Sequence, residues 1–284
     1  GGREVVLAHS GGGLLLAVDG GGFEKDSGRF DLVFPVLHGP GGEDGSVQGM
    51  LESLGLPFVG AGSRASAIAM DKLTMKTLAA GAGLPQTDFF EASGLDSEET
   101  SACVEKSFGF PCFLKPSGLG SSVGITKVET ASGIEAALAE ARRYDRRVIV
   151  ERAVAGRELE MALLGGASPE TSPLGEIATA TGFYDFKSKY VDTGAALIVP
   201  AEVGDNVRSE ADALAARVWQ LIGCHGMARV DFFLQNDGRL LFNEVNTIPG
   251  FTAISMFPRC WQAAGLSMAA LVRRLLAGAA ERPD

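Results

Sequence analysis

Hydrophobic positions recur along the chain with two different periods. Short apolar runs bounded by glycine, proline or polar residues predict strands. The strands expected on this basis cover residues 31–37, 58–59, 111–115, 125–128, 147–151, 159–164, 174–180, 196–199, 227–234 and 239–245. Apolar residues instead recur every three or four positions at Val207, Ala211, Leu214, Val218 and Leu221. That spacing predicts one buried face of a helix.

Further helices are expected at residues 47–54, 63–80, 132–144 and 266–279. Gly55 and Gly81 follow the first two as stop signals, and Ser132-x-x-Glu135 begins the third with the pattern of a capping box. Helices mixed with strands, with much antiparallel pairing, predict an α/β (α+β) fold. Breaks near residues 62 and 151 divide the chain into three expected domains, 1–62, 63–150 and 151–284.

Composition narrows the possible functions. The chain has 284 residues, 46% of them hydrophobic and 21% charged, which is enough apolar material for a large core. A formal net charge of -10 without a basic stripe argues against nucleic acid as a partner. No apolar run approaches the ~20 residues of a membrane span, and Cys103, Cys112, Cys224 and Cys260 lack C-x-x-C spacing. We therefore expect a cytoplasmic protein with reduced cysteines and no membrane partner.

The strongest chemical signal is a pair of motifs, Arg229-x-Asp231 and Glu244-x-Asn246, on either side of an expected turn at 237–238. Counting outward from a two-residue turn pairs Asn236 with Arg239, Phe233 with Phe242, Asp231 with Glu244 and Arg229 with Asn246. The four motif residues then share one face of the strand pair. Carboxylates directly opposite each other repel unless a cation lies between them, and Mg²⁺ prefers oxygen ligands. The motifs predict a Mg²⁺ site at Asp231, Glu244 and Asn246; the alternative is a polar face in solvent.

A second signal is the glycine- and serine-rich segment 115–124 between two expected strands. Glycine lets backbone N–H groups approach an anion, serine adds donors, and Lys115 at the strand end can reach a phosphate. The segment lacks the G-x-x-x-x-G-K-[ST] pattern, which excludes a Walker P-loop. Lys72, in a helical segment, is another candidate cation. A flexible hairpin and a solvated lysine are the alternatives that the residues alone leave open.

Two more segments have weaker signals. The stretch from Glu151 to Glu158 crosses an expected domain break, where free backbone groups can read an adenine edge and Glu158 can accept from ribose hydroxyls. Residues 181–193 combine aromatic residues with two lysines, show no clear period and are long for a connection, which is typical of a lid. An ordinary domain junction and an exposed crossover are the alternatives.

Together the motifs resemble the D-alanine–D-alanine ligase family in order and spacing. The matching segments are His38-Gly39, Gly42-Glu43-Asp44-Gly45, Val47-Gln48-Gly49, Met70-Asp71-Lys72, the 115–124 loop, Tyr184-Asp185 to Lys189-Tyr190, Arg229-Val230-Asp231 and residues 244–250. The resemblance implies a three-domain ATP-grasp architecture with an N-terminal α/β domain and ATP between the central and C-terminal domains. It also implies a homodimer that joins two D-alanine molecules through an acyl phosphate, for peptidoglycan synthesis.

The resemblance further implies roles for individual residues. ATP would be held by Lys72, Lys115, Glu151, Ala153, Val154, Glu158, Lys189, Asn243 and Glu244. Two Mg²⁺ ions, for which Mn²⁺ can substitute, would be ligated by Asp231, Glu244 and Asn246, and a monovalent cation is left open. The catalytic groups would be Arg229, the Gly250 backbone N–H, Ser121 and Tyr190. The two amino acids would be surrounded by these four residues and by His38, Ser255 and Met256.

The N-terminus departs from the family pattern. The family has a strand followed by G-G-x-S-x-E-[HR]-E-V-S, in which the first glutamate binds the ammonium group of the first D-alanine. Here Gly1-Gly2 run directly into Arg3-Glu4-Val5, Gly2 stands at the position of that glutamate, and the role is not transferred to Glu4. The N-terminal domain is therefore expected to be incomplete. A D-alanine–D-lactate ligase and a non-catalytic nucleotide-binding protein are the competing interpretations of the whole chain.

Overall fold

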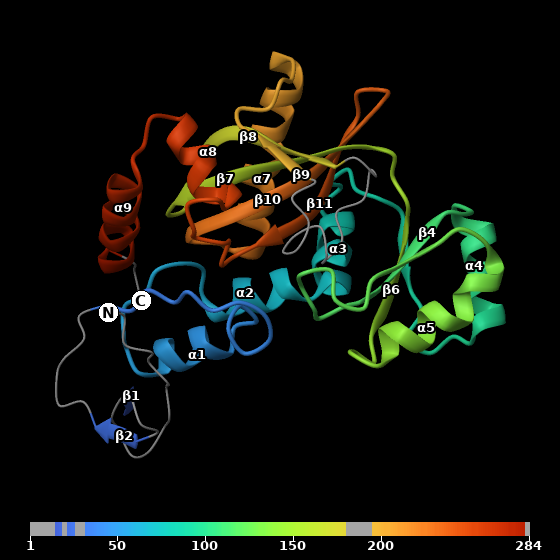
Figure 1. Cartoon of the computed structure of the whole chain (residues 1–284), viewed down its shortest axis with the longest axis horizontal. Coiled ribbons are helices and arrows are strands. Elements are labelled where there is room, and N and C mark those ends of the chain that lie inside the picture. The colour runs from blue at the N-terminus through green and yellow to red at the C-terminus, as the bar shows by residue number, and fades with distance from the viewer. Residues whose placement is uncertain (1–14, 19–21, 26–31, 180–194, 282–284) are drawn as a thin grey trace.

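Two antiparallel sheets organise the protein (Figure 1). The structure, a computed structural model, describes residues 15–18, 22–25, 32–179 and 195–281. The first sheet has the strand order β3–β6–β4–β5, with bounds Phe89–Glu91, Val148–Arg152, Cys112–Pro116 and Thr126–Val128. The second has the order β11–β10–β7–β8–β9, with bounds Leu240–Asn246, Gly226–Gln235, Gly156–Gly165, Pro169–Thr179 and Ala195–Ile198. A separate ribbon pairs β1 (Leu15–Val18) with β2 (Gly22–Lys25).

Helices α4 (Ser97–Ser107) and α5 (Ile134–Arg142) pack beside the four-stranded sheet, at the right of Figure 1. Side chains alternate along β4, so that Cys112 and Leu114 are buried in the core with these helices. The same alternation sends Phe113 and Lys115 to the opposite face. Because side chains alternate along β4, one face of the strand contributes to the core and the other is available to bind a ligand.

The five-stranded sheet has helices on both faces. Helices α2 (Ser63–Met70), α3 (Lys72–Gly81) and α7 (Asp205–Ile222) share a core with Leu159, Met161, Val230 and Phe232. On the other face, α8 (Met256–Ala263) and α9 (Met268–Ala280) pack against Ala162, Leu164 and Met227. Arg229 and Asp231 have the same parity as Met227, so they lie on this second face, toward the four-stranded sheet.

The sequence predicted the long elements and missed several short ones. The helix expected from Val207 to Leu221 is confirmed as α7, and residues 47–54 correspond to α1 (Ser46–Ser53) before Gly55 at a φ of +62°. The strand expected at 31–37 is wrong: among the described residues of that range, only Val33 pairs, in an isolated parallel bridge with Phe58. The single helix expected at 63–80 is divided at Asp71, which is extended.

The predicted capping box at Ser132 is also wrong. Residues 131–133 form a 3₁₀ turn, and Ser132 Oγ hydrogen-bonds Thr130 Oγ1 at 3.0 Å instead of capping α5. A capping box does exist at Asp96 and Glu99, where it begins the unpredicted helix α4. Helix α8 was missed because Pro258 resembles a helix breaker, although proline is tolerated in the first turn.

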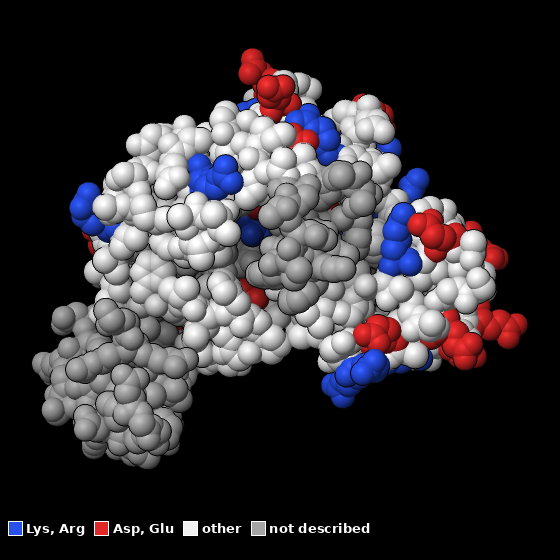
Figure 2. Space-filling model, viewed as in Figure 1, with Lys and Arg blue, Asp and Glu red and all other residues white. Residues whose placement is uncertain are grey.

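Charged side chains of both signs are spread over the described surface that Figure 2 shows. On this face, the described Lys and Arg side chains are interspersed with Asp and Glu, without one basic patch. No single helix of the described residues has the length and apolar composition of a membrane span; α8 and α9 pass that test only jointly, across a bend of 105°. The expected domain boundaries near 62 and 151 stay a prediction.

Replacing Asp96 with alanine should destabilise the protein by about 1 kcal/mol, because the first turn of α4 loses its side-chain acceptor. Urea denaturation followed by circular dichroism measures the change. Ser132→Ala is the matched control, expected to change stability by less than about 0.5 kcal/mol, because Ser132 caps no helix. Equal destabilisation by the two substitutions would contradict the assigned caps.

Candidate active site

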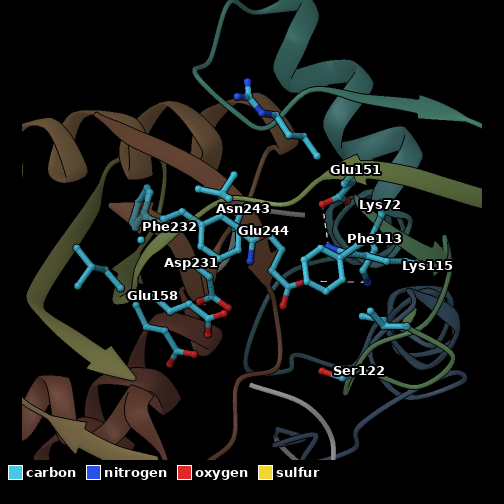
Figure 3. A pocket seen from close by; sticks show the side chains of 17 residues that line it. Lys72, Phe113, Lys115, Ser122, Glu151, Glu158, Asp231, Phe232, Asn243 and Glu244 are labelled. Atoms are coloured by element: carbon cyan, nitrogen blue, oxygen red, sulfur yellow. Dashed lines mark hydrogen bonds and ion pairs between the residues drawn. The ribbon is translucent and has the colours of Figure 1, made fainter. Parts of the chain in front are cut away.

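A cleft with charged walls lies between the two sheets (Figure 3). Its volume, counted out to open solvent, is about 920 Å³. Figure 3 shows Lys115 and Glu151 on one side and Asp231 and Glu158 on the other. Of the predicted site residues, those that line this cleft are Lys72, Lys115, Glu151, Val154, Glu158, Asp231, Asn243 and Glu244. The predicted nucleotide and metal residues are therefore largely brought together, although Ala153 and Asn246 do not line the cleft.

The β10–β11 hairpin carries the acidic wall, and its register differs from simple counting. The turn has three residues, 236–238, with Gln235 N–H donating to Arg239 O at 2.9 Å and Gly238 at a φ of +88°. Phe232 consequently pairs with Phe242. The predicted pairs Phe233–Phe242 and Asn236–Arg239 are wrong, whereas Asp231–Glu244 and Arg229–Asn246 are confirmed.

A β-bulge explains why the pairs Asp231–Glu244 and Arg229–Asn246 form as predicted although the turn has a different length. The register shifts between Asp231 and Phe232, and Asn243 is the extra residue on β11. Without this shift Glu244 would lie opposite Val230, whose side chain is buried in the core beside α7. The bulge instead brings both Asn243 and Glu244 to the cleft.

Arg229 is clamped between two carboxylates. Its Nε and Nη2 donate to Asp231 Oδ1 and Oδ2, each at 2.7 Å, and its Nε lies 3.2 Å from Glu160 Oε2. Burial opposes the charge of Arg229, but Asp231 and Glu160 outweigh it and hold the pKa of Arg229 well above its usual value. Glu160, which pairs with Asp231 across β7 and β10, is absent from the predicted site. The available signal was that Glu160 lies in the expected strand 159–164, two residues after the predicted ribose-binding Glu158.

The predicted metal ligands fit Mg²⁺ by donor chemistry. Asp231 and Glu244 are paired across the hairpin, and Asn246, whose Oδ1 accepts from Ile248 N–H at 2.9 Å, follows on the same strand. Within the described part of the chain, no three Asp, Glu, His or Cys side chains converge as a metal cluster. Mg²⁺ is commonly held by one or two carboxylates together with substrate phosphates and water. This donor set suits that mode of binding.

Two lysines form the basic wall. Lys115 extends from β4 and donates to Glu151 Oε2 at 2.8 Å. Lys72 is the first residue of α3; its Nζ donates to Leu119 O at 2.6 Å and lies 3.9 Å from Glu244 Oε2. Lys72 therefore bridges the glycine loop and the metal-motif carboxylate across the cleft.

Asp71 fixes the position of Lys72. Its Oδ1 accepts from Thr74 N–H at 2.9 Å and from Ser117 Oγ at 2.8 Å, and its Oδ2 pairs with Arg147. Burial alone would raise the pKa of Asp71, but these hydrogen bonds and Arg147 lower it. The charged carboxylate ties the first turn of α3 to the glycine loop.

The glycine loop contains two strained residues. Ser121 and Ser122 have φ angles of 54° and 58°, a left-handed conformation that is uncommon outside glycine and clusters at functional sites. Ser122 lines the cleft, whereas the predicted substrate residue Ser121 does not. A Cβ on Gly120 would lie 3.5 Å from Glu43 Oε1, so this loop adjoins the N-terminal loop 39–45.

His38 and Glu43 pair in that N-terminal loop. His38 Nδ1 lies 3.9 Å from Glu43 Oε2, while Glu43 Oε1 accepts from Gly39 N–H at 2.9 Å. The Glu43 carboxylate raises the pKa of His38, with partial opposition from burial. The backbone of Ile248 also raises this pKa, so the predicted substrate residue His38 lies near the chain that follows β11.

The other predicted substrate residues follow β11. Ser255 Oγ accepts from Thr252 N–H at 3.1 Å, and a Cβ on Gly250 would lie 2.8 Å from the same oxygen. Met256, the first residue of α8, is buried beside Gly175. Lys189 and Tyr190, with the rest of the expected lid 181–193, lie outside the described residues.

Comparison with known proteins identifies the family to which the chain belongs. A family model described as D-ala D-ala ligase C-terminus matches residues 78–277, and one described as D-ala D-ala ligase N-terminus matches residues 14–61. A D-alanine–D-alanine ligase of Bacillus velezensis is 48% identical over 256 residues, which are 89% of this chain and 72% of the relative. One of Geobacillus thermodenitrificans is 44% identical over 267 residues, 93% of this chain and 73% of the relative.

Solved structures give the same result. The D-alanine-D-alanine ligase from Coxiella burnetii superposes with a TM-score of 0.84 at 34% identity, covering 99% of this chain and 74% of that one. The VanG D-Ala:D-Ser ligase from Enterococcus faecalis superposes with a TM-score of 0.83 at 35% identity, covering 91% and 76%. The mixed α/β fold of the ATP-grasp class is thereby confirmed. The chain belongs to the D-alanine–D-alanine ligase family.

Glu244→Gln should weaken Mg²⁺ binding in the presence of ATP by at least about tenfold. Losing a group that merely hydrogen-bonds a metal ligand already costs that much, and Glu244 is proposed as a ligand itself. The reason is loss of one of two paired carboxylates. Calorimetric titration with Mg²⁺ measures the affinity, and Glu105→Gln, an exposed carboxylate on α4, is the control. Near-normal Mg²⁺ affinity in Glu244→Gln would exclude Glu244 as a ligand.

Glu43→Gln should lower the pKa of His38, because the negative charge that favours the imidazolium is lost. A raised folded pKa stabilises the protein fully below the unfolded value of about 6.5, and the stabilisation disappears as pH rises through the folded pKa. Wild type should therefore exceed Glu43→Gln in stability most at acidic pH. NMR titration measures the pKa, with His225 as the internal control; an unchanged His38 pKa would contradict the pair.

Proposed function

We propose that the protein ligates two D-alanine molecules to D-alanyl-D-alanine at the expense of ATP, as a cytoplasmic step of peptidoglycan synthesis. The observation that carries the proposal is the paired Asp231 and Glu244 on one wall of a cleft whose other wall presents Lys72 and Lys115. The carboxylates can bind a divalent cation, and the ammonium groups on the opposite wall can bind phosphates. A nucleoside triphosphate with its metal ion needs both. Family membership supports the two amino acids as the other substrates.

The basic wall is suited to phosphate. A small cavity beside the main cleft is lined by three lysines and two glutamates, Lys72, Lys76, Lys115, Glu151 and Glu244, an excess of one positive charge. In the proposal, Lys72 and Lys115 contact ATP phosphates, joined by Lys189 when the lid 181–193 closes. Glu151, Val154 and Glu158 hold adenine and ribose. Ala153 N–H already donates to Pro111 O at 3.1 Å, so a backbone N–H contact to adenine falls to Val154.

The chemistry needs mainly positioning and charge stabilisation. The carboxylate of the first D-alanine attacks the γ-phosphate, ADP leaves, and the amine of the second D-alanine attacks the acyl phosphate carbonyl with loss of phosphate. Mg²⁺ or Mn²⁺, held by Asp231, Glu244 and Asn246, would neutralise phosphate charge. Arg229 and the Gly250 N–H stabilise the acyl phosphate and its tetrahedral successor.

The amino acids would lie among His38, Ser121, Tyr190, Ser255 and Met256. The second substrate is proposed to be D-alanine because Tyr190 is neutral below a pKa of about 10 and does not repel an incoming ammonium group. A cationic residue there would favour the uncharged nucleophile of D-lactate. A homodimer and the domains 1–62, 63–150 and 151–284 complete the proposal.

Phosphate release from ATP should depend on D-alanine, and D-alanyl-D-alanine should dominate from about pH 7 upward, where Tyr190 is still neutral. Coupled phosphate release measures the first outcome. Chromatography of products from D-alanine mixed with D-lactate or D-serine, between pH 6 and 9, measures the second. Asp231→Asn is the inactive control. Nucleotide binding without D-alanine-dependent release would favour a non-catalytic protein, and mainly D-alanyl-D-lactate at neutral pH would overturn the Tyr190 argument.

A further inference from the structure

Lys76 is a fully buried lysine behind the basic wall. It is 2% exposed, on α3, one turn after Lys72. Its Nζ donates to Thr87 Oγ1 at 2.7 Å and lies 5.8 Å from the centre of the Phe89 ring. Its backbone carbonyl accepts from Gln86 Nε2 at 2.7 Å. These contacts fix the ammonium group in place, and Lys76 lines only the small inner cavity, not the main cleft.

Lys76 shares one carboxylate oxygen with Lys115. Glu151 Oε2 lies 2.8 Å from Lys115 Nζ and 3.8 Å from Lys76 Nζ. Glu151 is itself 2% exposed, and its Oε1 is buried with no hydrogen-bond partner among the described residues. Burial alone would raise the pKa of Glu151, but Lys115 and Lys76 lower it, so the carboxylate stays charged.

The two lysines differ in freedom. Lys115 lines the main cleft and is 13% exposed at its side chain, while Lys76 is 3% exposed and held by Thr87. A phosphate that attracts Lys115 would remove the nearest cation from Glu151. Leaving a buried carboxylate without a cation is strongly unfavourable, so the move requires a second cation that stays behind.

We propose that Lys76 is a positioning residue that keeps Glu151 compensated, so that Lys115 is free to turn from Glu151 to a nucleotide phosphate. The inference rests on the proposed function, in which Lys115 binds ATP. In Lys76→Met, Glu151 would depend on Lys115 alone, and Lys115 would be withheld from the nucleotide. Removing the charge of Glu151 as well, in Lys76→Met/Glu151→Gln, would release Lys115 again.

The experiment is calorimetric titration with a non-hydrolysable ATP analogue and Mg²⁺. Lys76→Met should bind the analogue about tenfold more weakly than wild type, a coupling typical of residues in one ionic network. The double variant should bind the analogue within about threefold of Glu151→Gln alone, because Lys76 then has no charge to compensate. In turnover, the KM for ATP should rise more than the KM for D-alanine, with kcat less affected. Lys106→Met, an exposed lysine on α4, is the control.

The outcomes separate the inference from the function. Wild type that does not bind the analogue contradicts the proposed function itself. Wild-type binding with unchanged affinity in Lys76→Met, or a double variant that binds much more weakly than Glu151→Gln, refutes the positioning role. If Lys76→Met does not fold, Glu151→Gln and the double variant are compared. Equal affinities support the proposal, because Lys76 has no charge to compensate, and unequal affinities overturn it.

Discussion

The cleft depends on one constraint: a carboxylate taken out of water must be held by a cation. Glu151 is 2% exposed and Asp231 is 7% exposed, and a buried charge without a partner is very costly. Lys115 pairs with Glu151 at 2.8 Å, and Arg229 pairs with Asp231 through two hydrogen bonds of 2.7 Å. The Lys115–Glu151 pair links β4 to β6, and Arg229 links β10 to β7 through Glu160 at 3.2 Å. The groups proposed to meet the ligand therefore also hold the walls in shape. A ligand that brings both phosphate and a divalent cation exchanges these pairs instead of burying new charge.

Strand alternation delivers the charged groups to the cleft without special loops. Along β4 and β10, every second side chain is buried in a core. The side chains between them, such as Lys115 and Asp231, line the cleft. The helical contribution is different, because Lys72 reaches the cleft only where α3 begins. Asp71 makes that beginning by leaving the helical conformation and capping the next turn. The rigid parts of both sheets thus set the spacing between the walls.

Sequence patterns predicted the elements whose formation depends on neighbouring residues in the chain. The long apolar period of α7, the strands of both sheets except β3 and the pairing of Asp231 with Glu244 were predicted from the sequence. Helix α4 was missed because it buries little besides Thr100 and Val104, which leaves no apolar period to detect. Lys76 was missed for another reason: its burial depends on Glu151, far along the chain, and no local pattern distinguishes a buried lysine from a solvated one. Glu160 is similar, since its importance comes from Arg229 on a neighbouring strand.

The bulge at Asn243 can also be inferred from the sequence, when the apolar patterns of β10 and β11 are compared. On β10 the residues of one parity, from Ala228 to Leu234, are all apolar and face α7. On β11 neither parity is uniform, because Leu240 and Phe242 are followed at the same parity by Glu244. Burying Leu240, Phe242 and Val245 on one face requires a change of phase between 242 and 245, and one extra residue supplies it. All three do belong to the core beside α7. The apolar side of the hairpin therefore forces the bulge, and the bulge in turn directs Glu244 to the cleft opposite Asp231.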